Sequence, residues 1–382
     1  MGISRRALVR QITVGAAAAI GLPSLARAKS IGPESSAAAD GSETNGLVRL
    51  HKNENPIPSS RVLDLMRGAA ASTASRYPEV HEAALRTKIA SLHHVYADQV
   101  VPGSGSDDVL GLALTAFACG RTVLTATPTY DRFVQRASAI ADRIVAVPIR
   151  RDYSHDLEAM LSRADAATGL VYICNPNNPT ASLTPRRDIE AFIGRLPQAC
   201  HVVIDEAYHY YVPGSPEHAS FLEAPLDDDR IIVTRSFSTA YGLAGLRVGY
   251  AIAQPAAAAR MEAARVSSGI SGIAALSAIA ALDDPDHLAA AVKRNADAKQ
   301  EFCNQANARM LRTIDSHANF VLLNTGHPSA DMVEHFRKNA VLVAGPFAPF
   351  DKHIRVSLGT RAEMQEFWRV FDLLPPSHVM TM

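Results

Sequence analysis

The stretch that decides the fold is GLVYICNPNNPT, residues Gly169–Thr180. Its first half is apolar, and the second half, from Asn175 to Thr180, holds two prolines and three asparagines. An apolar run bounded by turn residues is typical of a buried β-strand, and prolines and asparagines favour an abrupt turn. We therefore predict a buried strand with polar side chains at its carboxyl end, which is where α/β enzymes keep their sites.

Similar strand-like runs occur on both sides of this stretch. Between about residues 100 and 255 they read RTVLTATP, RIVAVPI, HVVIDEAY, RIIVTRSF and LRVGYAIA. Helical patterns such as DDVLGLALTAFA and RRDIEAFIGRL lie between several of them. Alternation of strands and helices predicts an α/β domain with a mostly parallel sheet.

A second, smaller domain is expected after this region. An alanine-rich helical stretch covers about Pro255–Ala308, and NFVLLNT (Asn319–Thr325) and HIRVSLGT (His353–Thr360) are strand candidates. We therefore predict a large α/β domain over residues 60–275 and a smaller α+β domain over residues 276–382.

The N-terminus has the features of an export signal. SRRALVR (Ser4–Arg10) carries the twin-arginine pattern, Ile12–Ala19 is an apolar run, and Ala26–Ala28 supplies small residues for cleavage. These parts in this order are typical of a signal peptide. We predict that residues 1–28 are removed, that residues 29–59 form a polar leader and an N-terminal arm, and that the mature protein is periplasmic or secreted.

The composition is that of a soluble globular protein with a sizeable core: 382 residues, 47% hydrophobic and 20% charged. Lys plus Arg and Asp plus Glu both number 38, so the formal net charge is zero. This balance gives no electrostatic reason to expect nucleic acid, or a membrane after signal removal, as a partner. The 4 cysteines are widely scattered without a CxxC pair, so we predict neither a disulfide framework nor a metal site.

The segment GSGSDDVL places two glycines before a helix that opens with Ser106, Asp107 and Asp108. A helix N-terminus has free backbone N–H groups that favour a phosphate, and nearby glycines let the backbone come close to it. A serine followed by acidic residues is also an ordinary helix start. Both interpretations stay open from this segment alone.

Carboxylates and hydroxyls end the next two strands. VVIDEAYHYY carries Asp205 and Glu206 at the end of an apolar run. A buried carboxylate is costly unless it meets a cation, which could be a protonated heterocyclic nitrogen or simply an arginine. In RSFSTAYGLAGLRVGY, the side chains of Ser236, Ser238 and Arg247 could converge on one phosphate group.

Taken together and in this order, these segments resemble the fold-type I pyridoxal phosphate aminotransferases of class I and II, in particular the histidinol-phosphate aminotransferase branch. The resemblance covers about residues 47 to 372 and includes HKNENP (His51–Pro56), SRYPE (Ser75–Glu79), ANFVLL and IRVSLGT. It implies a large domain with a mostly parallel, seven-stranded type of sheet, and a smaller α+β domain. It also implies a homodimer that uses pyridoxal 5'-phosphate and acts on an amino acid or its keto acid.

The same resemblance implies a role for each matching side chain. Asp205 would pair with the pyridine N–H and keep the ring an electron sink, and Tyr130 would stack on the ring. The other cofactor-binding residues that it implies are Ser106, Asp107, Asn178, Tyr208, Ser236, Ser238, Arg247 and, from a neighbouring subunit, Tyr77. On the substrate side it implies Asn55 and Arg355; Arg355 would bind a carboxylate, unless it forms an ordinary ion pair.

The pattern breaks at one position. Counted back from Arg247, residue 239 should be the lysine that holds the cofactor covalently and moves a proton, but it is Thr239. A threonine hydroxyl can neither form that covalent bond nor serve as a base at neutral pH. Losing a positioned acid–base group costs about 10²–10⁴ in rate, so we expect ordinary transamination to be severely impaired and any cofactor to be bound non-covalently.

Few other side chains could move the proton in place of the lysine. Lys52 lies beside the implied substrate site, and Lys352 lies three residues before Arg355. Tyr208 and its neighbour His209 are further candidates, since the ordinary pKa of histidine suits the task. A strand-end His209 that points away from the ring is the simpler interpretation.

Two smaller departures concern the turn and the substrate side. Ala181 stands where the family usually has a glycine, directly after NPNNPT, and Ala344 stands where relatives often carry a substrate-binding arginine. The second departure argues against assigning histidinol phosphate as the substrate.

Three functions are consistent with these features. The first is an exported aminotransferase-like enzyme that uses non-covalently bound pyridoxal phosphate. The second is a non-catalytic protein that binds the cofactor or a cofactor–amino-acid adduct. The third is an enzyme that reuses the pocket for cofactor-independent acyl or amide transfer. Turnover with an amino donor separates the first from the others, and cofactor affinity separates the second from the third.

Overall fold

The computed structural model describes residues 46–374 except residues 213, 215–217, 224–227 and 267–268. The predicted signal peptide, residues 1–28, and the leader up to residue 45 lie outside the described residues. Among the helices of the described part, none is long and apolar enough to cross a membrane.

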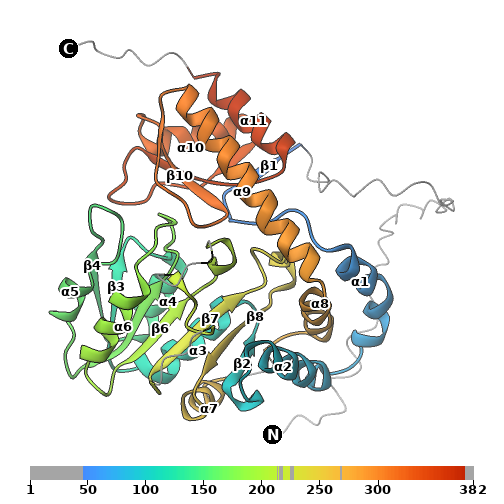
Figure 1. Ribbon diagram of the computed structural model, residues 1–382, viewed down its shortest axis with the longest axis vertical. Helices are drawn as coiled ribbons and strands as arrows, with labels where there is room; N and C mark the ends of the chain where they lie inside the picture. Colours follow the sequence, from blue (N-terminus) through green and yellow to red (C-terminus); the bar gives the residue numbers. More distant parts are fainter. Residues whose placement is uncertain (1–45, 213, 215–217, 224–227, 267–268, 375–382) are drawn as a thin grey trace, which may run out of the picture. The chain divides into compact units, whose positions relative to one another are not determined.

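The predicted α/β domain is present and is built on a seven-stranded sheet with the order β2-β8-β7-β6-β5-β3-β4 (Figure 1). Strand β8 runs antiparallel to both of its neighbours, and the other neighbouring strands are parallel. The quoted stretch supplies β5, next to the central strand β6, as its apolar character predicts. The strands are β2 (Val100–Gly103), β3 (Thr122–Thr127), β4 (Arg143–Pro148), β5 (Thr168–Cys174), β6 (His201–Asp205), β7 (Ile231–Ser236) and β8 (Gly249–Ala253).

Helices cover both faces of this sheet. On β5, Leu170 and Tyr172 pack in a core with α3, α4 and α7, whereas Val171 and Ile173 pack in a second core with α2, α6 and α8. Successive side chains of a strand point to opposite faces, so the continuous apolar run feeds both cores. The helices are α1 (Ser60–Thr73), α2 (Glu79–His93), α3 (Ser106–Ala118), α4 (Asp131–Ile140), α5 (Leu157–Leu161), α6 (Arg186–Arg195), α7 (Pro255–Ala263) and α8 (Gly272–Leu282).

The helical stretch predicted over Pro255–Ala308 is divided into α7, α8 and α9 (Pro285–Ala308). Ser271 caps α8 by accepting a hydrogen bond from the N–H of Ala274, and Pro285 begins α9, where its missing N–H costs nothing. The predicted domain boundary between residues 275 and 276 falls inside α8. The buried alanines of α8 pack in the core of the large sheet on both sides of that boundary.

The smaller sheet is antiparallel, with the order β12-β10-β9, and α9, α10 and α11 accompany it (Figure 1). A parallel pair, β1 with β11, brings the N-terminal arm into the same core through Leu50. The elements are β1 (Val48–Leu50), β9 (Arg312–Thr313), β10 (Phe320–Asn324), β11 (Val341–Val343), β12 (His353–Ser357), α10 (Ser329–Lys338) and α11 (Arg361–Phe371).

Candidate active site

The centre of the site is Asp205 at the carboxyl end of β6. Its side chain is buried, and its two oxygens accept hydrogen bonds from the hydroxyls of Tyr172 (2.7 Å) and Thr234 (3.0 Å) on the neighbouring strands. Burial raises the pKa of Asp205 to about 6, although these two hydrogen bonds act in the opposite direction. The sheet therefore holds a carboxyl group that gains from a cationic partner.

Tyr208 lies one turn beyond Asp205, and its hydroxyl oxygen is the acceptor for two side-chain amides. Asn53 donates to it over 2.9 Å and Asn178 over 3.0 Å. A phenol oxygen has two acceptor positions, so both are filled and the proton of Tyr208 is left to be donated elsewhere. Burial raises the pKa of Tyr208 well above its ordinary value, so the residue is a proton donor and not a base at neutral pH.

Arg355 reaches the same region from β12 of the smaller sheet. Its guanidinium donates to the side-chain oxygen of Asn178 (2.5 Å) and to the backbone oxygen of His51 (2.7 Å). It also lies over the rings of Phe320 and Phe347, and its Nε is buried without a hydrogen-bond partner among the described residues. Burial lowers the pKa of Arg355. A cation with an unused donor is suited to bind an anion.

The second part of the site is the N-terminus of α3. Gly105 has a φ of 81°, and a Cβ at this position would lie 2.3 Å from Nη2 of Arg247. A Cβ on Gly249 would lie 2.4 Å from the backbone nitrogen of Ser106. Glycine at both positions therefore allows the guanidinium of Arg247 and the first turn of α3 to come together, which concentrates positive charge where an anion can bind.

Ser236 ends β7, and Ser238 follows it and lies beside Arg247. The hydroxyl of Ser236 accepts a hydrogen bond from the backbone N–H of Ser238 (3.1 Å), and Ser238 Oγ lies 3.5 Å from Nη1 of Arg247. The structure thus brings Ser238 beside Arg247 and joins Ser236 to Ser238.

Asp107 and Tyr130 contact each other directly. The hydroxyl of Tyr130 donates to one oxygen of Asp107 over 2.7 Å. The other oxygen lies 3.1 Å from Arg132 and 3.6 Å from Arg247. Asp107 therefore orients the ring of Tyr130 and holds two guanidinium groups close to the N-terminus of α3.

Thr239, the residue at the lysine position, is buried. Its hydroxyl donates to the backbone oxygen of Ala207 over 2.8 Å, between Asp205 and Tyr208 in the chain. This hydrogen bond joins the turn after β7 to the turn after β6. The threonine therefore has a structural partner, and its hydroxyl proton is already used.

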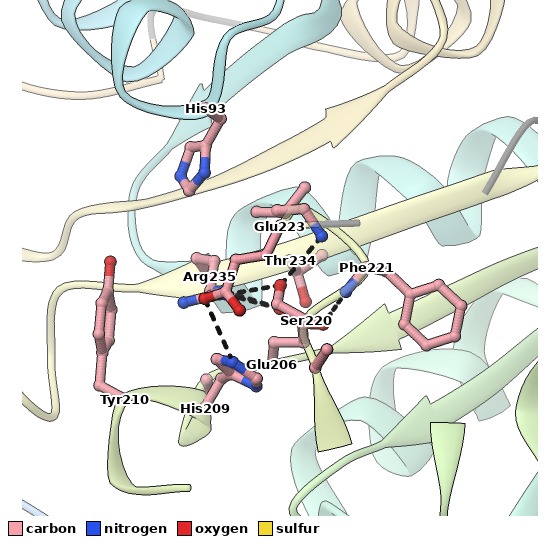
Figure 2. A network of polar contacts seen from close by, with 12 residues as sticks. His93, Glu206, His209, Tyr210, Ser220, Phe221, Glu223, Thr234 and Arg235 are labelled. Carbon is pink, nitrogen blue, oxygen red and sulfur yellow. Dashed lines mark hydrogen bonds and ion pairs between the residues drawn. The ribbon is translucent and has the colours of Figure 1, made fainter. Parts of the chain in front are cut away.

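Of the predicted substitute bases, Tyr208 lies in the hydrogen-bonded cluster, and the other three make no hydrogen bond to it among the described residues. Lys52 and Lys352 are exposed. His209 begins the 3-10 helix His209–Tyr211 and lies with Glu206 and Arg235 in the polar network of Figure 2. Because Asp205 and Glu206 are successive residues, they point to opposite faces of the sheet. His209 is therefore associated with the face of the sheet opposite to Asp205. This is the arrangement in the simpler interpretation, where the histidine points away from the ring.

Glu206 and Arg235 form a buried ion pair at 2.8 Å (Figure 2). Glu206 also accepts hydrogen bonds from the hydroxyl of Ser220 and the backbone N–H of Phe221. The sequence left two possible partners for a carboxylate at this strand end, a protonated heterocyclic nitrogen and an arginine. For Glu206 the partner is an arginine. Asp205 has no such partner among the described residues.

The N-terminal motif HKNENP contributes Asn53, which was not predicted, to the hydrogen bonds around Tyr208. Asn55 donates to the backbone oxygen of Ala240 (3.0 Å) and lines a groove beside α9, whereas Asn53 donates to Tyr208. The two residues have the same type and stand two apart, so the sequence pattern could not separate them. Tyr77 is 84% exposed, so the described residues leave its side chain largely uncovered.

The two smaller departures have clear places in the structure. Ala181 has a φ of 58°, the left-handed region that glycine occupies without strain, which explains the family's preference there. Ala344 pairs with Arg355 through an isolated β-bridge. The short side chain of Ala344 therefore leaves Arg355 without a second arginine beside it at this position.

Besides Asn53, three contributors were not predicted: Tyr172, Thr234 and Arg132. Tyr172 and Thr234 are polar residues within apolar strand segments, and their alternation places them on the same face as Asp205 once the strand order is known. Arg132 follows Tyr130 by two residues within the segment PTYDRF. The missing information was the pairing of strands and the position of α4 beside α3, which a single sequence does not reveal.

The site therefore combines a buried carboxyl group, an anion-binding helix end and a buried arginine. Comparison with known proteins gives the same assignment: residues 45–371 match the family model described as aminotransferase class I and II. The histidinol-phosphate aminotransferase of Shouchella clausii (strain KSM-K16) is 34% identical over 325 residues, which cover 84% of this chain and 87% of that protein. The histidinol-phosphate aminotransferase of Bacillus subtilis (strain 168) is 33% identical over 324 residues, which cover 84% and 89%.

The fold agrees with that of a solved relative. The crystal structure of histidinol-phosphate aminotransferase from Sinorhizobium meliloti, in complex with pyridoxal-5'-phosphate, superposes with a TM-score of 0.78 at 30% identity. The match covers 86% of this chain and 90% of that chain. These findings confirm the resemblance to fold-type I aminotransferases, and the chain belongs to the class I and II aminotransferase family.

Proposed function

We propose that the protein is an exported aminotransferase-like enzyme that binds pyridoxal phosphate without a covalent bond and acts on an amino acid or its keto acid. The observation that carries this proposal is the set of polar groups around Thr239. Asp205, Tyr208, Asn178 and Arg247 all keep positions suited to the cofactor although the lysine is missing. A chain that had lost the cofactor would have little physical reason to hold a buried carboxyl group with a raised pKa.

The chemistry of the donor set fits pyridoxal phosphate. The phosphate would be held by the N-terminus of α3, Ser236, Ser238 and Arg247, which supply backbone N–H groups, hydroxyls and a guanidinium. Asp205 would accept a hydrogen bond from the protonated pyridine nitrogen, the cationic partner that its buried carboxyl group lacks. When bound, the cofactor supplies an electron sink for negative charge that develops on the substrate carbon.

The protein residues supply binding and proton positions. Arg355 would hold the substrate carboxylate through the donor at Nε, which is buried without a partner in the described residues. Tyr208 would donate its proton toward the cofactor's phenolic oxygen, because Asn53 and Asn178 fill its acceptor positions. Thr239 would take no part in proton transfer, since its hydroxyl donates to Ala207.

The group that removes the substrate proton would have to come from outside this cluster. Lys52 is exposed in the single chain, and a long flexible lysine can reach several ångströms from its backbone. His209 is held beside Glu206, whose backbone oxygen accepts a hydrogen bond from the N–H of His209 (Figure 2). We therefore rank Lys52 above His209 as the replacement base, and Tyr208 as a donor only.

The second candidate function is binding without turnover. It is favoured by the hydrogen bond from Thr239 to Ala207 and by the exposure of Lys52 and Lys352. In that case the protein would hold the cofactor or its adduct with an amino acid in the same pocket. The two functions share the cofactor site and differ only in whether an amino donor is consumed.

Export and dimer formation are part of the proposal. The twin-arginine pattern before residue 29 supports export of the folded chain. Tyr77 and Val80 are 84% and 76% exposed, and exposed apolar side chains at neighbouring positions suit a contact with a second copy. Size-exclusion chromatography of the mature chain, with Tyr77→Ala beside it, tests this part: a native chain that stays monomeric contradicts it.

Absorption spectroscopy tests the proposed function. The mature chain, from residue 29, is titrated with pyridoxal phosphate and then with amino acids, beside Arg247→Gln and the exposed control Arg143→Gln. We expect saturable binding, a second spectral change with an amino acid, and keto acid formation measured by mass spectrometry. Binding without keto acid supports the non-catalytic alternative. No binding, or equal binding by the native chain and Arg247→Gln, contradicts the cofactor assignment.

A further inference from the structure

A groove of about 910 Å³ lies between α9, α11 and the arm at residues 55–57. This volume is within the range of about 300–1,000 Å³ that small-molecule sites occupy. Its lining includes Asn55, which the resemblance places on the substrate side, but none of Asp205, Asn178 and Arg355, so it is a neighbouring groove and not the cofactor site itself. We propose that this groove binds a small organic anion with an apolar body and a hydroxyl group at its inner end.

The inner end of the groove holds an unused hydrogen-bond acceptor. Asn319 is 2% exposed and lines the groove, and its Oδ1 is buried without a partner in the described part of the chain. The orientation of this amide follows from its other contact, since Nδ2 donates to the backbone oxygen of Asn53 over 2.8 Å. The reverse orientation would place two oxygens against each other. A buried acceptor without a donor is costly, so a ligand that donates a hydrogen bond is favoured here.

The donor is a hydroxyl and not an ammonium group. Two of the groove's carboxylates have cationic partners, Asp297 with Lys293 and Asp372 with Arg309. The third, Glu301, accepts a hydrogen bond from Gln305 and is exposed, away from the buried Oδ1 of Asn319. An ammonium beside the neutral Oδ1 of Asn319 would therefore lose its hydration without a counter-charge. A hydroxyl has a much smaller desolvation cost than an ammonium group, and Tyr211 lines the same groove.

The wall next to this end is apolar. Phe302, Leu358, Met364 and Trp368 line it, and each is at least nine-tenths buried. These side chains come from α9, α11 and the turn that follows β12, so the wall is fixed by packing within one core. A flat or aliphatic body of a few carbon atoms would bury apolar surface against it.

The rim carries two arginines without carboxylate partners. Arg294 and Arg361 are exposed and line the groove, and among the described residues neither forms an ion pair. The other two arginines of the lining are paired, Arg309 with Asp372 and Arg369 with Glu366. Unpaired guanidiniums at the mouth favour an anionic group there, which gives the ligand its orientation.

The groove adjoins the candidate active site through two hydrogen bonds. Asn319 donates to the backbone oxygen of Asn53, and the side chain of Asn53 donates to Tyr208. The inference itself does not rest on the proposed function, because it uses only the contents of the groove.

Tryptophan fluorescence tests the inference, because Trp368 is the only tryptophan of the chain and lines the groove. The mature protein is titrated with para-hydroxyphenylpropionate under excitation selective for tryptophan. We expect a saturable change in emission at millimolar concentration or below. Phenylpropionate, which lacks the hydroxyl, should bind at least about threefold more weakly, since one neutral hydrogen bond is lost.

Variants locate the bound probe. The double replacement Arg294→Gln with Arg361→Gln should weaken binding about tenfold or more, because charged hydrogen-bond donors are lost, whereas Arg337→Gln, an exposed arginine on α10, should not. Arg355→Gln should leave the fluorescence titration unchanged. If the emission of Trp368 does not change on titration, the inference is overturned. A second copy of the chain covering the groove would also give that result. Equal affinity in the double variant, or loss of binding in Arg355→Gln, overturns the inference as well.

Discussion

Replacing Asp205 with asparagine should change the stability of the cofactor-free protein in a way that depends on pH. The free energy of unfolding of the variant, relative to that of the native chain, should be higher at neutral pH than at acidic pH. The asparagine side chain has the same shape as that of aspartate. Its Oδ1 can accept from Thr234 while its Nδ2 donates to the hydroxyl of Tyr172, which can also accept. The substitution therefore keeps the bond from Thr234, reverses the bond to Tyr172 and removes the titratable carboxyl group. The proton of Tyr172 loses its acceptor, which adds a cost that does not depend on pH.

The magnitude follows from the pKa of Asp205, which burial raises from 3.8 to about 6. A folded pKa above the unfolded one means that the native protein binds the proton more tightly. The associated stability is therefore complete below about pH 4 and is lost as the pH rises through about 6. A shift of about 2 pKa units corresponds to about 3 kcal/mol, of which about 1.4 kcal/mol falls between roughly pH 5 and 7.5.

Urea denaturation of both proteins at a series of pH values measures this difference. Histidines such as His93 and His155, whose pKa values burial lowers to about 4, change the stability of both chains equally and cancel in the comparison. The free energy of unfolding of Asp205→Asn minus that of the native chain should rise by about 1.4 kcal/mol from roughly pH 5 to 7.5. A difference that stays constant, or falls, would refute the argument that burial raises this pKa.

Three further substitutions test single contacts. Arg247→Gln should weaken pyridoxal phosphate binding about 10–100-fold, because charged hydrogen bonds worth ~1.5–3 kcal/mol are lost; unchanged affinity in an absorbance titration would contradict the phosphate assignment. Glu206→Gln leaves Arg235 buried without a carboxylate and should lower the free energy of unfolding by about 3–5 kcal/mol. The control Glu366→Gln, in an exposed pair, should lower it by under ~1 kcal/mol. Equal losses for both variants in urea denaturation would refute the assignment of a buried pair. Thr239→Val should cost about 1 kcal/mol and leave cofactor affinity unchanged, and a large loss of affinity would show a direct role for the hydroxyl.

Much of the fold could be predicted because its signals are local. The apolar run before Asn175 and the similar runs along the chain became strands of the large sheet, since each is bounded by turn residues. The breaks within Pro255–Ala308 were missed because alanine is a good helix former throughout, and the breaks depend on single caps at Ser271 and Asp284.

The site was predicted less completely because it is assembled from different strands. Asp205, Tyr208 and Asn178 lie at or just beyond the ends of their strands, so the sequence pattern located them. Partners on neighbouring elements, such as Tyr172 and Asn53, depend on strand pairing and on the register between the arm and β12. That information exists only in the folded chain.

The central claim, that the protein holds pyridoxal phosphate without a covalent bond, is tested most directly by intact-mass measurement. The native chain and Thr239→Lys are saturated with the cofactor, dialysed, and reduced with borohydride, which fixes any covalently held cofactor. The account predicts that the native chain retains the cofactor through dialysis but gains no mass on reduction, whereas Thr239→Lys gains the mass of one reduced cofactor. A native chain that gains that mass on one of its own lysines, or that retains no cofactor, would contradict it.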